Sequence, residues 1–299
     1  MRILETAEYS KMGYIWGNNP SQQCCWMQYA DDALIIAKSQ KAAQGLVKLF
    51  EAWCSWSKMD IRLDKCISFG MCMGHTKYQQ ILPKIALDKG VIPAVPIDGH
   101  FKYLGRIFNF DMKDEIPKKE VEEKIEKLLH KITSLNVKPQ TKLKIFEIFV
   151  PTQIMFELKI YSFGQTFISS VIDSLCTTYI RKWLECPVSS CVREWMSSPV
   201  KFCGLNIPSF AERAERMHLS KRNALRCSKN LTVREMWAMT NGMNIKTDDL
   251  LCNSDFKTAK KQVKEKQSNA SITHFLGLKS QGLIAKTVSE LIFPKQIEN

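Results

Sequence analysis

The chain has 299 residues, of which 45% are hydrophobic, enough to bury the core of one large domain or of two to three small ones. Forty-three lysines and arginines against thirty acidic residues give a formal net charge of +13, which favours nucleic acid over a membrane surface as the polyanionic partner. No apolar run approaches the length of a membrane span, so no membrane partner is expected.

The eleven cysteines are odd in number, and no secretory signal precedes them, which indicates free thiols in a reducing compartment. The sequence has no CxxC pair and no histidine at zinc-finger spacing, so a zinc site is excluded. We therefore expect an intracellular protein of the nucleus or cytoplasm, with no targeting signal to decide between the two.

The first feature in chain order is a hairpin around the sequence YADD, with strands Cys24–Tyr29 and Ala33–Ala37 and a turn at Ala30, Asp31 and Asp32. Two adjacent carboxylates on a tight turn can share divalent cations, because Mg²⁺ prefers oxygen ligands and completes its shell with water and phosphate. Two such ions, about 3.5–4 Å apart, stabilise the attacking and leaving oxygens of phosphoryl transfer. The alternative is an ordinary polar turn, in which aspartate is common.

The elements after this hairpin alternate between helix and strand. Helical spacing of apolar residues predicts a helix from Gln40 to Ser57, with Ser39 placed to cap it. Alternation predicts a strand over Ile61–Phe69 and a strand pair over Phe101–Phe108. The segment between them, residues 74–100, contains three prolines and is expected to be rich in loops.

From Pro117 onward the pattern is helical, with Pro117 at a first helical position and a first helix continuing to Leu135. A second helix is predicted over 140–160 with an interruption at Pro151, and a third over 167–184. The change of pattern near residue 115 therefore predicts a small strand-and-helix unit followed by an all-helical unit.

Positive charge gathers in the second half, where residues 161–230 carry a net charge of +5 against +2 for residues 1–100. Ser209 and Glu212 form a capping-box pattern, and the helix that follows carries a row of basic residues. These are Arg213, Arg216, Lys221, Arg222 and Arg226. A second polar, lysine-rich helix is predicted near residues 255–267. The row after Ser209 is either a nucleic-acid contact or a solvated helix face.

The YADD hairpin resembles the third palm motif of reverse transcriptases, and the helix 40–57 resembles the palm helix that follows that hairpin. Residues 61–66 resemble the next motif, in which a lysine, here Lys65, approaches the phosphates of the incoming nucleotide. Residues 101–105 resemble the primer-grip hairpin. The resemblance gives nucleic-acid contacts in this hairpin to Tyr103, Leu104 and Gly105.

Two later segments narrow the resemblance to one type of reverse transcriptase. Residues 180–187 look like the Arg-x-Trp-Leu-x-Leu-Pro segment beyond the thumb in reverse transcriptases of non-LTR (LINE-type) retrotransposons, site-specific elements in particular. Residues 203–208 resemble the Gly-Gly-Leu-Gly-Ile pattern that follows there. The resemblance implies an α+β fold in three parts. These are a partial palm over 1–115, an all-α thumb over 116–190 and a basic helical C-terminal region over 191–299.

In such a family the activity is RNA-directed DNA polymerisation by two-metal nucleotidyl transfer on an RNA template and a DNA primer. The resemblance implies Mg²⁺ on Asp31 and Asp32, with Lys65 in the catalytic set. It is consistent with nucleic-acid contacts from the helix after Ser209, and no obligate protein partner is evident. These helical contacts are Arg213, Arg216, Arg222 and Arg226.

The resemblance also implies a third carboxylate, a second palm motif and fingers, which this sequence does not supply. Residues 1–30 contain no aspartate, and their only acidic residues are Glu5 and Glu8. We therefore expect a C-terminal fragment of a reverse transcriptase that is inactive alone. One alternative is a non-catalytic nucleic-acid-binding protein derived from such an element. Another is a helical interaction protein in which YADD is coincidental.

Overall fold

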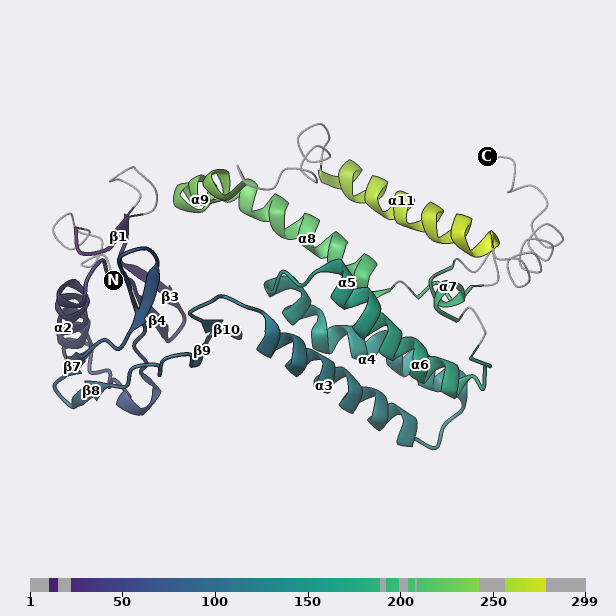
Figure 1. Cartoon of the computed structure of the whole chain (residues 1–299), viewed down its shortest axis with the longest axis horizontal. Helices are drawn as coiled ribbons and strands as arrows, with labels where there is room; N and C mark the ends of the chain where they lie inside the picture. Colours follow the sequence, from purple (N-terminus) through teal and green to yellow (C-terminus); the bar gives the residue numbers. More distant parts are fainter. Residues whose placement is uncertain are drawn as a thin grey trace. The chain divides into compact units, whose positions relative to one another are not determined.

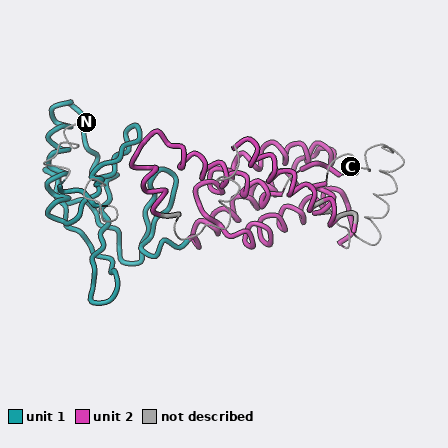
Figure 2. The backbone as a smooth tube through the Cα atoms, turned by 90° about the horizontal axis from the view of Figure 1, so that it is seen from above, with its two compact units in different colours: residues 1–113 teal, residues 114–299 magenta. Residues whose placement is uncertain are grey.

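The structure, a computed structural model, describes residues 11–15, 23–188, 192–198, 204–207, 209–241 and 256–277. The chain divides into two compact units, Met1–Lys113 and Asp114–Asn299 (Figure 2). The division lies close to residue 115, where the sequence pattern changes. The fold is mixed, with β-hairpins and one long helix followed by a series of helices (Figure 1).

In its described part, the first unit contains five antiparallel strand pairs, each formed by strands that are neighbours in the chain. The pairs are β1 (Tyr14–Ile15) with β2 (Gln23–Cys24), β3 (Trp26–Tyr29) with β4 (Asp32–Ile35), β5 (Gly70–Met73) with β6 (Tyr78–Ile81), β7 (Ile85–Leu87) with β8 (Gly90–Ile92), and β9 (His100–Tyr103) with β10 (Arg106–Asn109).

Helix α2 (Gln40–Trp56) organises this unit. Ser39 caps it as predicted, because its hydroxyl accepts a hydrogen bond from the N–H of Ala42 at 3.2 Å. Val47 of α2 packs into a buried cluster with the β7–β8 hairpin, and the Gln44 side chain hydrogen-bonds both the carbonyl (2.7 Å) and the N–H (2.8 Å) of Ala86 in β7. Helix α2 is thereby fastened to this hairpin by apolar and polar contacts.

One prediction for the first unit is wrong. Residues 61–69 do not form a strand but contain a 3-10 turn, η2 (Leu63–Lys65), because Leu63 packs against the α2 and β7–β8 cluster while Arg62 and Asp64 pair outside it. Residues 74–100, expected to be rich in loops, contain β6, β7 and β8, but more than half of the segment lies outside these strands. Its prolines also lie outside the strands, where a missing N–H breaks no ladder. The strand pair over Phe101–Phe108 is confirmed as β9–β10.

The second unit is built on α3 (Glu115–Ser134), α4 (Pro139–Ile160) and the run α5 (Gln165–Phe167), η3 (Ile168–Ile172) and α6 (Asp173–Trp183), of which η3 is a π-helix. Their apolar stripes meet in one large core (Figure 1). Its fully buried members include Ile125, Leu129, Phe146, Ile154, Leu158 and Ile180.

Proline does not interrupt α4, and this prediction is wrong. The helix continues through Pro151, which is itself buried. A proline inside a helix costs about 3 kcal/mol. The residues on either side, Val150, Ile154 and Leu158, have no exposed surface, and burial of side chains of this size stabilises by about 1.5–3 kcal/mol each. Burial on both sides of the proline therefore outweighs its cost. Pro117 also lies inside a helix, since α3 begins at Glu115 rather than at Pro117.

The remaining described helices are α7 (Val192–Ser197), α8 (Phe210–Arg226), α9 (Leu231–Asn241) and α11 (Phe256–Leu276). Ser209 caps α8 as predicted, accepting a hydrogen bond from the Glu212 N–H at 3.1 Å. The lysine-rich helix predicted near 255–267 is confirmed and extends to Leu276. None of the helices in the described ranges is long and apolar enough to cross a membrane.

Asp173, the first residue of α6, is fully buried and joins α6 to α8. Its carboxylate accepts hydrogen bonds from the N–H groups of Phe210 (2.7 Å) and Ala211 (3.2 Å), and the Arg193 guanidinium lies 3.8 Å away. The first N–H groups of a helix have no partner within it, so this carboxylate fixes where α8 begins. Burial raises the pKa of Asp173 to about 6, although the two hydrogen bonds and Arg193 act in the opposite direction.

The segment 204–207 closes the end of α7. Leu205, Asn206 and Ile207 donate backbone hydrogen bonds to the carbonyls of Trp195 (3.1 Å), Ser198 (2.9 Å) and Met196 (2.8 Å), in that order. Carbonyls at a helix end lack partners within the helix, and this segment supplies them. Cys203 and Pro208, which belong to the same predicted motif, lie outside the described residues.

Candidate functional site

The YADD hairpin turns more tightly than the sequence predicts. Tyr29 pairs directly with Asp32, so the turn consists of Ala30 and Asp31 only, and Asp32 is the first residue of β4 rather than part of the turn. Ala30 has a φ of 52°, a left-handed conformation that is rare for a residue with a side chain. The Gln28 amide donates a hydrogen bond to the Ala30 carbonyl at 2.9 Å and supports this turn.

The hairpin presents its polar groups to solvent. Both Asp31 and Asp32 are exposed, and Tyr29 is 68% exposed. Exposed carboxylates held on a short turn have little backbone freedom and are accessible to a hydrated cation or a phosphate. This arrangement suits Mg²⁺, which binds one or two carboxylates and keeps several waters.

Helix α2 packs against this hairpin. The ring of Trp26 in β3 lies 5.1 Å from that of Phe50 in α2, and Leu46 of α2 forms a buried cluster with Cys25, to which Ile35 of β4 contributes. If the YADD sequence were coincidental, α2 would be expected to pack away from this hairpin. The contact therefore counts against the interpretation of the chain as a helical interaction protein.

The β9–β10 hairpin also has a two-residue turn, made by Leu104 and Gly105. Both residues have positive φ, 46° and 80°, as a type I′ turn requires. Gly105 adopts this conformation without strain, whereas Leu104 does so at a cost and is 40% exposed at the tip. The strands are held by Phe101, whose ring stacks on Phe108 at 5.5 Å. Leu104 and Gly105 thus shape the turn and are not core residues.

The charge of the first hairpin acts on the second. The pKa of Tyr103 is raised, first by partial burial and then by the negative charge of Asp32. Asp32, a predicted metal ligand, thus influences Tyr103, a predicted primer-contact residue 71 positions further along the chain.

Lys65 is less closely associated with this site. It lies exposed in η2, and its N–H donates to the Arg62 carbonyl at 3.0 Å. Asp31, Asp32 and Lys65 all lie in described ranges, and the structure records no hydrogen bond or ion pair between Lys65 and either aspartate. Its contact with nucleotide phosphates stays a prediction.

Asp31 and Asp32 fit a divalent cation as two ligands of a larger set. Among the described residues, no group of three or more histidine, cysteine, aspartate or glutamate side chains is placed to hold a metal ion. The two carboxylates have the hard oxygen donors that Mg²⁺ prefers, and the other ligands would have to be waters, phosphate or groups from outside this set.

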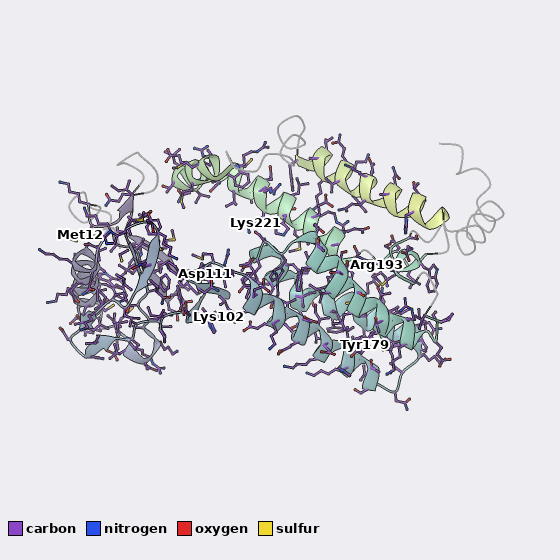
Figure 3. All side chains as sticks on the ribbon, in the orientation of Figure 1. Met12, Lys102, Asp111, Tyr179, Arg193 and Lys221 are labelled. Carbon is purple, nitrogen blue, oxygen red and sulfur yellow. The ribbon has the colours of Figure 1, made fainter. Side chains whose placement is uncertain are left out.

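The basic residues of α8 are more buried, and form more hydrogen bonds within the protein, than the side chains of a solvated helix face would. Arg213 and Arg216 are half-buried, and burial is the main cause that lowers the pKa of Arg213. Arg216 donates to the Gln267 side chain at 2.8 Å. Lys221, which is labelled in Figure 3, donates to the Ile160 carbonyl at 3.3 Å. Arg222 and Arg226 are also half-buried. Nucleic-acid binding by these residues stays a prediction.

The sequence reasoning missed Asp173. Its signal was available, because Asp173 sits within the apolar series Ile168, Ile172 and Cys176 of a predicted core-facing helix. A carboxylate among core positions needs a partner, and the partner here is the start of α8.

Comparison with known proteins agrees with this geometry. Residues 8–108, about a third of the chain, match the family model described as "Reverse transcriptase (RNA-dependent DNA polymerase)". No curated protein matches the chain. The matched segment contains both hairpins and α2, and the first unit of this protein is therefore similar to part of a reverse transcriptase domain.

Proposed function

We propose that this chain is part of an RNA-directed DNA polymerase of a non-LTR retrotransposon. In this proposal, residues 1–115 are the end of the palm, residues 116–190 are the thumb, and residues 191–299 form a basic helical region. The family match over 8–108 supports the polymerase family, and the motif order beyond residue 108 supports the non-LTR type.

The family match over residues 8–108 carries the proposal. A polymerase must hold the primer end beside its metal ligands, because positioning and electrostatic stabilisation account for most of phosphoryl-transfer catalysis. The two hairpins that the motif order assigns to these tasks both lie in the segment that matches the family model, and α2 packs against the first of them. Chance resemblance of two short motifs does not predict one family match that contains both.

In the site, Asp31 and Asp32 would hold Mg²⁺, which when bound stabilises charge on the oxygens of a transferring phosphoryl group. The tight turn keeps the two carboxylates at the hairpin tip. Tyr103 and the strained Leu104–Gly105 turn would contact the primer, and Lys65 would neutralise nucleotide phosphates. The template and primer are RNA and DNA in the intact family.

Two carboxylates are too few for the full reaction. The sequence offers no aspartate in residues 1–30 and no counterpart of the fingers, so metal and nucleotide are not both positioned by this chain. We expect no template-dependent nucleotide incorporation by the purified chain with Mg²⁺. Incorporation that is abolished by Asp31→Ala or Asp32→Ala would contradict this expectation.

The metal assignment is tested with Mn²⁺ as a paramagnetic substitute for Mg²⁺. Asp31→Asn and Asp32→Asn should each weaken Mn²⁺ binding about tenfold, because ligand charge sets the affinity of such sites. Electron paramagnetic resonance titration of free Mn²⁺ measures this. The matched control is Asp88→Asn, an exposed aspartate in the two-residue turn between β7 and β8. Equal Mn²⁺ affinity in all three variants and the parent chain would refute the metal site.

A non-catalytic nucleic-acid-binding protein derived from such an element is the second candidate. The net charge of +13 favours it. Duplex binding without Mn²⁺ binding at Asp31 and Asp32 would support this candidate over the polymerase.

A further inference from the structure

Helix α11 has two faces of different character, and one of them is occupied by packing. Ala259 has no exposed surface and Val263 is 7% exposed, because both pack against Leu219 of α8. Figure 1 shows α11 lying alongside α8. The apolar face of α11 is thus covered by the protein itself.

Polar contacts fix the rotation of α11 about its axis. The Gln267 side chain accepts a hydrogen bond from Arg216 of α8 at 2.8 Å, and its amide group donates a hydrogen bond to Glu215, which is also in α8. Further along, His274 lies 3.5 Å from Glu194 of α7. With two neighbours holding it, α11 presents a fixed outer surface.

That outer surface is a row of lysines. Lys257, Lys260, Lys261 and Lys264 are all exposed and follow the spacing i, i+3, i+4 and i+7, which places them on one face over about 10 Å of helix. The helix carries five lysines and one glutamate, a net charge of +4 before histidine is counted. Helix α3 also has five lysines, but it has five glutamates as well, so its net charge is zero. The two helices have equal numbers of lysines, and of the two only α11 has a net positive charge.

We propose that the Lys257–Lys264 face of α11 binds the phosphate backbone of a nucleic-acid duplex. Lysine supplies compact positive charges that neutralise phosphates without reading bases. The face lies outside the segment 8–108 that matches the reverse transcriptase family, and outside the α8 row predicted from the sequence. The inference rests on the proposed function only for its class of ligand.

Two observations select a duplex over other polyanions. Apart from His274, no exposed residue described in α11 has an aromatic ring, whereas proteins that hold single strands stack bases on aromatic side chains. An anionic membrane would take up the apolar face of an amphipathic helix, and that face is buried against α8. A lysine row on a fixed helix, whose apolar face is already buried, is suited to bind the regularly spaced phosphates of a duplex.

The test compares two triple variants in the full chain. Lys260→Gln, Lys261→Gln and Lys264→Gln remove three charges from α11, and Lys119→Gln, Lys127→Gln and Lys131→Gln remove three exposed charges from α3. The sets are matched, because each includes one lysine paired with glutamate at i,i+4 spacing, Lys261 with Glu265 at 3.7 Å and Lys127 with Glu123 at 4.0 Å.

Binding to a fluorescent RNA–DNA hybrid, a DNA duplex and a DNA single strand is measured by anisotropy over a salt series. Each phosphate neutralised contributes about 0.9 to the slope of log K against log salt for a duplex. We expect the α11 triple to lower the slope on both duplexes by about 2–3 and the α3 triple to lower it by less than 1. Circular dichroism verifies that both variants are folded.

Several results would overturn the proposal. These are equal loss of slope in the two triples, tighter binding of the single strand than of either duplex, a loss confined to anionic vesicles, and no duplex binding by the parent chain at low salt. The salt slope of duplex binding reports on the lysine face, and the Mn²⁺ titration reports on Asp31 and Asp32, so failure of the metal site and failure of the lysine face give different results.

Discussion

Replacing Asp173 with alanine should lower the free energy of unfolding by about 3 kcal/mol at pH 5. Alanine removes the acceptor for the N–H groups of Phe210 and Ala211 at the buried start of α8. Each buried donor left without a partner costs about 1–3 kcal/mol. Urea denaturation followed by circular dichroism gives the magnitude, and hydrogen exchange should show the amides of α8 losing protection first. Unchanged protection in α8 would mean that Asp173 does not hold the helix.

Asp173→Asn supplies the control, because it keeps one acceptor and removes the titration. The folded-state pKa of about 6 lies above the ordinary value of 3.8, so the folded protein binds this proton more tightly than the unfolded chain does. This contribution to stability is present below about pH 4 and is lost as pH rises through 6. Between these values the parent chain should lose up to about 3 kcal/mol relative to Asp173→Asn, at 1.36 kcal/mol per pKa unit. A pH-independent difference would contradict the assignment.

Gly204→Ala should destabilise the second unit by about 3 kcal/mol. A Cβ at this position would overlap the Ser198 carbonyl group and lie 2.6 Å from the Ser198 Cβ. Backbone atoms cannot rotate away as a side chain can, so the segment 204–207 must move and lose its hydrogen bonds to α7. Thermal and urea denaturation of the full chain measure the loss.

The matched control is Gly164→Ala in the same unit. A Cβ there meets no atom within 4 Å, and φ is −63°. Alanine should be neutral or stabilising by less than about 1 kcal/mol, because it reduces the freedom of the unfolded chain. Equal effects of the two substitutions would show that contact with Ser198 is not the cause.

Sequence patterns predict the elements of this fold where local signals and packing agree. Ser39 and Ser209 cap helices as expected, since a cap depends only on the first turn. Pro151 and Leu63 were misread because long-range burial decides their conformation. Spacing alone cannot supply the energy of a contact with a distant element.

The site is predictable to a similar degree. The motif was enough to predict Asp31 and Asp32 as candidate metal ligands. It did not predict that Asp32 lies inside a strand, because the length of the turn depends on the register of the two strands. The influence of the Asp32 charge on Tyr103 acts between residues far apart in the chain, and no periodicity encodes it. The lysine face of α11 required knowledge of which side of the helix is covered.

The π-helical turn Ile168–Ile172 has a consequence for the tolerance of this chain to insertion and deletion. Buried residues recur at every fourth position, Ile168, Ile172, Cys176 and Ile180, whereas an α-helix repeats every 3.6 residues. The wider turn absorbs this mismatch as one extra residue would. Deleting one residue within 168–172 would therefore restore a regular helix and leave the residues after it, including Asp173, on the same face. This turn is the place where the helix tolerates a change in length, although the identity of its buried side chains remains constrained.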